Sequence, residues 1–232
     1  MAISVQNIID AARQRTDKVA STFLTDATEL LEWCRHSMYE LYDLLVSSYG
    51  EEFFMSSLVL THTASDEYAT LSAVLVEQGH EIYKLLRVDY AYNSVRVPLK
   101  PFQWSDEILD DTAYAWEPGR IVRYRLAGRR MYFTPRPSSA KAVKIYYVPT
   151  ATTFSSLTNE LNPLMEMHSE YLITDLCIKI REKEDTDSAT FQKQKQALSH
   201  RVQHMAPPRD AGNPLPIPDV RNDGDWWPVG SD

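Results

Sequence analysis

The sequence predicts an α+β protein in which helices from both ends of the chain form one bundle around an inserted β-rich region. Three observations predict this class. Apolar residues recur at helical spacing before residue 50 and after residue 162. Between residues 51 and 150 the spacing shifts towards period 2, and β-branched and aromatic residues accumulate. The last 27 residues hold 6 of the 13 prolines and show no periodicity, which predicts an extended tail.

These changes in pattern divide the chain into four parts. Residues 1–50 form the first helices of the bundle, and residues 51–150 form a small antiparallel sandwich or barrel that includes a hairpin at 119–135. Residues 151–206 complete the bundle with a helical hairpin, and residues 207–232 form a proline-rich docking tail. At 232 residues and 44% hydrophobic content, the chain is long enough to bury a substantial core.

Two helices are expected before residue 50. Ser4 is a candidate N-cap for a short amphipathic helix that carries Val5, Ile8, Ile9 and Ala12 on one face. Asp26 and Glu29 have the spacing of a capping box in front of a second helix. Gly50 ends that helix, which would be about 24 residues long and therefore longer than average.

The β-rich region is expected to contain strands at 54–61, 68–75 and 82–92. A short helix capped by Ser105 follows, and strands at 121–126, 129–134 and 142–148 then form a meander. The first two strands of this meander are joined by a turn at Ala127–Gly128.

The C-terminal helical hairpin begins at Asn162–Pro163, with proline at the first helical position. A charged break, REKEDTDS, separates this helix from a fourth one. The apolar residues of the fourth helix are Phe191, Leu198, Val202 and Met205, and the two helices are expected to pack side by side.

Charge is distributed unevenly along the chain. The net charge is −8, yet no acidic residue occurs between Glu117 and Glu160. The same stretch carries the basic residues Arg120, Arg123, Arg125, Arg129, Arg130, Arg136, Lys141 and Lys144. An acidic protein with one strongly basic segment is not typical of sequence-specific DNA-binding domains, which are basic overall.

Cysteine content and apolar runs also predict the cellular compartment of the protein. Cys34 and Cys177 each lie among apolar residues of an expected helix, so we interpret them as buried thiols rather than a disulfide. No run of 18 apolar residues occurs, and the first residues lack the features of a signal peptide. We therefore expect neither membrane insertion nor secretion.

Catalytic and metal-binding signals are weak. His200 and His204 are spaced to share a helix face, but HRVQH lacks the glutamate of a zinc-protease motif, so a solvated face is favoured. The cluster Asp106, Glu107, Asp110 and Asp111 could form a cation site or an acid/base pair, but capping of a helix explains it more simply. The sequence predicts no catalytic residue, cofactor or metal, although a metal-dependent or carbohydrate-processing enzyme remains an alternative.

Two segments are candidate partner-binding sites. Arg123, Arg125, Arg129 and Arg130 alternate with tyrosines in the expected hairpin. They either keep a sheet edge soluble or contact phosphates or an acidic protein, and the phosphate reading leaves a nucleic-acid-binding module as a further alternative. In the tail, paired indoles without a core of their own favour docking on a partner. The candidate tail residues are Pro214, Pro216, Ile217, Pro218, Trp226 and Trp227.

The order of these segments resembles a known family. The chain presents LEWCRHSMYELYDLLVSSYGEEFF, then YRLAGRRMYFTPRP and VKIYYVP, a helical hairpin, and finally RDAGNPLPIPDVR. From about Asp26 to Arg221 it resembles the head-to-tail adaptor, or connector, proteins of tailed bacteriophages. The matching motifs are loose patterns, and Trp226–Trp227 lie outside the stretch that they cover.

The resemblance implies a structural virion protein, assembled in the host cytoplasm, and not an enzyme. Family members form a homo-oligomeric ring, usually of twelve copies, that binds the portal protein ring on one side and tail or nozzle proteins on the other. Double-stranded DNA passes through the central channel without sequence-specific binding. Arginines pointing into that channel would retain DNA, so we expect the basic hairpin to face an acidic protein surface.

Overall fold

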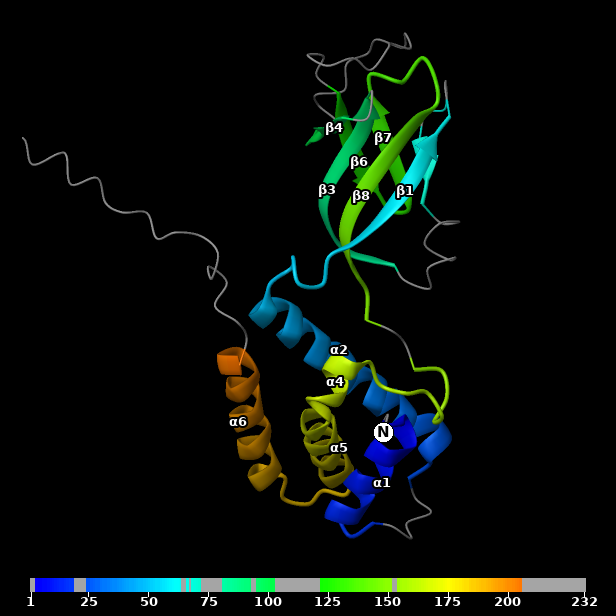
Figure 1. Cartoon of the computed structure of the whole chain (residues 1–232). Coiled ribbons are helices and arrows are strands. Elements are labelled where there is room, and N and C mark those ends of the chain that lie inside the picture. Colours follow the sequence, from blue (N-terminus) through cyan, green and yellow to red (C-terminus); the bar gives the residue numbers. More distant parts are fainter. Residues whose placement is uncertain are drawn as a thin grey trace, which may run out of the picture.

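The computed structural model describes residues 3–18, 24–63, 66, 68–71, 81–92, 95–102, 122–151 and 154–205. It confirms the α+β class, because helices gather at one end of the molecule and strands at the other (Figure 1). The helix expected to start at Ser105 and the tail from residue 207 onward lie outside the described residues.

The helices come from both ends of the chain. They are α1 (Val5–Arg15), the π-helical turn η1 (Asp26–Leu30), α2 (Leu31–Tyr49), α4 (Pro163–Glu166), α5 (Ser169–Lys183) and α6 (Ala189–Met205). Helix α5 packs against α1, α2 and α6, so it is central to this part (Figure 1). One hydrophobic core joins these helices, and its fully buried members include Ile8, Leu41, Leu45, Leu172 and Leu176.

Several helix ends agree with the sequence analysis. The Ser4 hydroxyl oxygen accepts a hydrogen bond from the Asn7 backbone N–H at 3.3 Å, which confirms the N-cap of α1. Asn162 caps α4 in the same way through the Leu164 N–H at 3.0 Å. Gly50 ends α2 with φ +87°, a backbone conformation that side chains other than glycine resist.

The capping box at Asp26 and Glu29 is wrong. Thr25 precedes the first helical residue, without a side-chain cap, and residues 26–30 form a π-helical turn. The Asp26 carboxylate instead binds the Arg13 guanidinium of α1 at 2.5 Å. Glu29 pairs with Lys183 of α5, also at 2.5 Å. Both acids are held by cations of other helices, and this tertiary pairing replaces the local cap.

The strands among the described residues form two four-stranded sheets. The first has the order β1-β8-β3-β4, with β1 at Ser56–His62, β8 at Lys141–Pro149, β3 at Ile82–Tyr92 and β4 at Val95–Pro98. The second has the order β2-β7-β6-β5, with β2 at Tyr68–Thr70, β7 at Arg130–Thr134, β6 at Arg123–Ala127 and β5 at Lys100–Pro101. Their facing sides share a second hydrophobic core that includes Leu58, Val88, Met131, Ile145 and Tyr147.

The predicted meander is wrong in its third strand. Strands β6 and β7 pair as a hairpin, but β8 leaves their sheet and lies between β1 and β3 (Figure 1). Pro135 and Pro137 follow β7 and cannot donate backbone hydrogen bonds, which ends that ladder. The nine-residue β8 finds longer partners in the other sheet. Pairing is also not wholly antiparallel, because the short strand β5 runs parallel to β6.

Both helices of the predicted C-terminal hairpin also differ from expectation. The segment predicted as one helix from Pro163 is interrupted at Met167–His168, which separates α4 from α5. Of the four apolar residues expected on α6, only Val202 is fully buried, and Met205 remains 47% exposed. One side of α6 is therefore incompletely covered by the described residues.

Tyr42 joins the helices to the sheets. Its hydroxyl donates to the Pro149 carbonyl at 2.6 Å, where β8 ends. Its ring lies edge-on to Phe54, just before β1, and to Tyr83 of β3, at centroid distances of 5.4 and 6.0 Å. The chain thus enters and leaves the sheets through two paired neighbours, β1 and β8, beside one tyrosine of α2.

Candidate protein-binding surface

The β6–β7 hairpin places its arginines on one face. A two-residue loop, Gly128–Arg129, joins the strands, and Gly128 has φ +59° at the first loop position. Strand alternation puts the buried Tyr124, Met131 and Phe133 in the core. The intervening positions therefore point outward from the second sheet.

Strand register groups these outward residues into rows. Tyr68, Tyr132 and Arg125 are cross-strand neighbours on β2, β7 and β6. The rings of Tyr68 and Tyr132 lie 5.6 Å apart, and the Arg130 guanidinium carbon lies 4.4 Å from the Tyr68 ring centre. We call the five residues Tyr68, Arg123, Arg125, Arg130 and Tyr132 the Arg–Tyr face. A guanidinium that stacks on a ring, as that of Arg130 does on Tyr68, can still donate N–H groups to carboxylates or phosphates.

Arg129 has a different position from the other three predicted arginines. It lies in the loop, and its side chain forms an ion pair with Glu81. Both side chains are about 60% exposed, so the pair contributes little to stability. Of the four arginines predicted to act together, the structure brings Arg123, Arg125 and Arg130 to one face.

A second basic cluster lies on the outer face of the first sheet. Lys144 and Arg87 approach the Tyr146 ring at 4.8 and 5.9 Å, and Arg96 donates to the Tyr146 hydroxyl at 3.4 Å. Asp89, which is 1% exposed, accepts from Arg87 at 2.6 Å. Because β8 joins the other sheet, the basic stretch of the sequence supplies two separate surfaces. Arg87 and Asp89 are two residues apart in the sequence, but the pairing of β3 with β8 is what brings Lys144 to them.

The helical part contains a buried charge network that sequence analysis missed. The Asp175 carboxylate accepts from Lys179 at 2.7 Å and Lys195 at 2.6 Å, and also from the Ser37 hydroxyl. Glu40 accepts from Lys195 at 2.7 Å. Burial alone would raise the pKa of Asp175, but the hydrogen bonds from Lys179, Lys195 and Ser37 outweigh it and hold that pKa below its usual value. The network ties α2, α5 and α6 together.

The candidate metal residues do not converge in the described part of the chain. His200 and His204 are both exposed on α6. Among the described residues, no group of three or more His, Cys, Asp or Glu side chains is arranged to hold a metal ion. The acidic cluster Asp106–Asp111 lies outside the described residues, as do the tail candidates Pro214, Pro216, Ile217, Pro218, Trp226 and Trp227.

The cysteines are free thiols, as expected. Cys34 and Cys177 are both fully buried in the helical core and unpaired. Burial raises the pKa of Cys34 to about 12 and that of Cys177 to about 11. Neither thiol is therefore a candidate nucleophile.

Comparison with models of known protein families finds no match. A search of curated proteins likewise finds no match. Within the residues that the structure describes, no helix combines the length and apolar character needed to cross a membrane.

Proposed function

We propose that this protein is a structural head-to-tail adaptor subunit of a tailed bacteriophage, forming a ring between the portal and the tail around the DNA channel. The observation that carries the proposal is the Arg–Tyr face on the outer side of the second sheet. The two sheets lie at the opposite end of the molecule from α1, α5 and α6 (Figure 1). An adaptor needs two separate binding surfaces, and two bodies at opposite ends of one subunit can supply them. The resemblance of segment order adds support.

In this proposal the helices of both chain ends form the bundle through which subunits pack side by side. The tail, residues 207–232, is the arm that docks on the portal or on a neighbouring subunit. The Arg–Tyr face meets an acidic protein surface, because arginines lining the channel would bind DNA phosphates and slow its passage. The net charge of −8 agrees with a subunit that lets DNA pass.

The test is assembly on a portal ring from the same phage, followed by native mass measurement. The wild-type protein is expected to join the ring as multiple copies. Arg125→Gln with Arg130→Gln should weaken incorporation about tenfold or more, which corresponds to about 1.4 kcal/mol. Lys144→Gln is the matched control, since Lys144 belongs to the same basic stretch but lies on the other sheet. Failure of the wild-type protein to bind the portal ring would refute the adaptor role.

A nucleic-acid-binding module is the second candidate, because arginines interleaved with tyrosines can also contact phosphates and stack on bases. Binding of the isolated protein to DNA should then fall steeply as salt concentration rises. If Arg125→Gln with Arg130→Gln removed that binding and left portal assembly unchanged, this second function would replace the first.

A further inference from the structure

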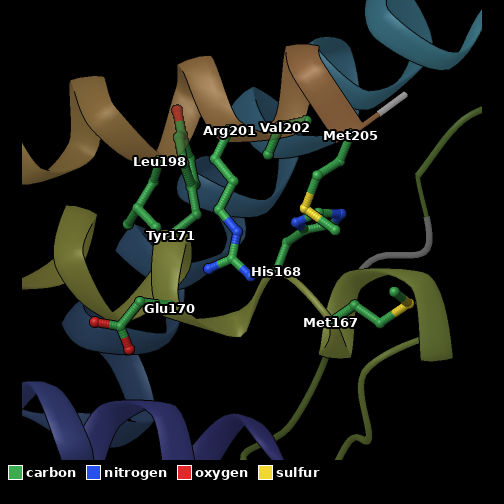
Figure 2. Close-up of a pocket in the computed structure, with 8 residues that line it drawn as sticks. All are labelled: Met167, His168, Glu170, Tyr171, Leu198, Arg201, Val202 and Met205. Atoms are coloured by element: carbon green, nitrogen blue, oxygen red, sulfur yellow. The ribbon is translucent and has the colours of Figure 1, made fainter. Parts of the chain in front are cut away.

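A small apolar groove lies where the end of α6 crosses the start of α5 (Figure 2). Its volume is about 220 Å³. Side chains from both helices and from the α4–α5 break line it: Met167, His168, Glu170, Tyr171, Leu198, Arg201, Val202 and Met205. The groove is separate from the Arg–Tyr face, which lies on the sandwich.

Two features show that this groove lacks an occupant among the described residues. Met167 and Met205 on its rim are 69% and 47% exposed, the first being the most exposed of the large apolar side chains described. His168 is 8% exposed, and its Nε2 atom is buried without a hydrogen-bond partner in the described part of the chain. A buried polar atom without a partner carries a free-energy cost that a suitable donor would remove.

The size of the groove favours a single aromatic side chain. Small-molecule sites usually span about 300–1,000 Å³, which is larger than this groove. An engineered apolar cavity of about 150 Å³ holds one benzene molecule. A volume of about 220 Å³ therefore accommodates one aromatic side chain and not two.

The lining chemistry matches an indole. An indole N–H only donates hydrogen bonds, and His168 Nε2 can accept one when the imidazole is neutral. Burial, together with the nearby positive charge of Arg201, lowers the pKa of His168, so the ring is neutral at pH 7. The methionine sulfurs favour aromatic contacts, and Arg201 extends from α6 across the groove, where a guanidinium can stack on an indole (Figure 2).

The same chain contains, after α6, a segment whose side chains match the lining of the groove. Met205, on the rim, is the last residue of α6, and Trp226–Trp227 follow 21 residues later. Residues 222–232 contain three acids and no base, whereas α6 contains Lys193, Lys195 and Arg201 and no acid. Glu170, the one acid of the lining, is already paired with Arg15. The charges of the segment and of the helix are complementary.

We propose that, in the free subunit, the groove between α5 and α6 binds one indole of the Trp226–Trp227 pair of the same chain, with the acidic segment lying against α6. Docking of the tail on a partner would release this segment from the groove. Only 20 residues separate Met205 from Trp226, and a tether of this length gives the pair a millimolar effective concentration at the groove. A second copy at micromolar concentration cannot compete with that tether. The inference stands whether or not the protein is an adaptor, because it concerns only this chain.

Disulfide cross-linking of the full-length chain tests the proposal. Met167→Cys places a thiol on the groove rim, and Asp225→Cys places one beside the tryptophans. The native thiols of Cys34 and Cys177 are buried and do not interfere. Met55→Cys with Asp225→Cys is the control, because Met55 is 48% exposed but lies next to β1.

The variant with Met167→Cys and Asp225→Cys, the groove pair, should cross-link about tenfold faster than the control pair, as expected for a docked tether. The product should have the mass of one chain at every protein concentration. Equal rates for both pairs would refute docking in the groove. A product with the mass of two chains, at a rate that rises with concentration, would refute docking within one chain.

A second measurement separates indole binding from simple proximity. Trp226→Ala with Trp227→Ala, added to the groove pair, should lower the cross-linking rate to that of the control. An unchanged rate would show that the tryptophans do not hold the segment in the groove and would overturn the proposal.

Discussion

The buried carboxylate of Asp175 links α2, α5 and α6. Its side chain is 4% exposed and receives two lysine ammonium groups and one hydroxyl. Its lysine partners lie on α5 itself and on α6, and Ser37 lies on α2. Removing one member of a buried ion pair leaves the others without compensation, which costs more than the intact pair contributes.

Asp175→Asn is therefore expected to lower the free energy of unfolding by about 3–5 kcal/mol. Urea denaturation of the two proteins measures the change. Glu32→Gln is a control, since Glu32 is 46% exposed in its pair with Arg35 and should matter by less than about 1 kcal/mol. Equal stabilities for wild type and Asp175→Asn would show that the network does not stabilise the fold.

The same carboxylate predicts a pH dependence. Its pKa is lowered in the folded state, so its stabilisation is complete above the unfolded-state pKa of about 3.9 and is lost as pH falls through the folded value. The stability difference between wild type and Asp175→Asn should be constant at neutral pH and should shrink below about pH 4. Denaturation series at pH 7, 4 and 3 test this; a difference that grows on acidification would contradict it.

The buried thiols give a further prediction. Cys177 Sγ donates to the Ala12 carbonyl at 3.7 Å, and both thiols have raised pKa values, so thiolate is scarce in the folded protein. A thiol-specific reagent at pH 8 should modify neither cysteine until urea unfolds the protein. Rapid modification of either one under native conditions would mean that the helical core opens locally.

At the level of helices, two ends use aspartate where glycine is usual. At the end of α1, the Lys18 N–H donates to the Arg13 carbonyl and the Asp17 N–H to the Gln14 carbonyl, and Asp17 has φ +59°. The end of α5 repeats this arrangement, and Asp185 has φ +53°. These are Schellman motifs, in which the residue after the C-cap adopts a left-handed conformation.

Replacing each of these aspartates by glycine should stabilise the protein. Asp185→Gly removes the steric cost of a positive φ and should raise the free energy of unfolding by about 0.5–1 kcal/mol. Gly50→Ala is the matched opposite, since Gly50 has φ +87° with open space around it, so only backbone strain opposes alanine there. Thermal unfolding compares them; a stabilising Gly50→Ala or a destabilising Asp185→Gly would contradict the reasoning.

Elements with local signals were predictable from the sequence, and those that depend on distant partners were not. The N-caps Ser4 and Asn162, the stop at Gly50 and the β6–β7 hairpin all rest on residues within a few positions of each other. The capping box failed because Arg13 binds Asp26, and the meander failed because β8 found longer partners. Asp185 carried no glycine signal for the end of α5.

The candidate site shows the same division. Arginines and tyrosines are interleaved in the sequence of the hairpin. In the structure Arg123, Arg125, Arg130 and Tyr132 occupy its outward side, whereas Tyr124 lies in the core. The contribution of Tyr68 could not be foreseen, because β2 is far from β7 in the sequence. Likewise, the assignment of Lys144 to a different surface follows from sheet order, which periodicity does not encode.

For the whole molecule, deletion of residues 207–232 tests how the tail relates to the folded body. Every buried residue of the two described cores lies before residue 206, so the truncated protein should remain folded with a cooperative urea transition. It should lose binding to the portal ring if the tail is the docking arm. Circular dichroism and native mass measurement report the two properties separately, and an unfolded product would place the tail in the core.

The pairing of β1 with β8 has a consequence for the order of folding. The helical core needs α2 and α5 to meet across more than 100 residues of chain, and closing a loop of that length costs about 4 kcal/mol in entropy. Ser56 pairs with Tyr147, so a sandwich that forms first brings residues 55 and 150 together before any helix docks. The folded sandwich then holds the two ends of the helical part close together. Its helices can assemble as if they were near neighbours in the sequence.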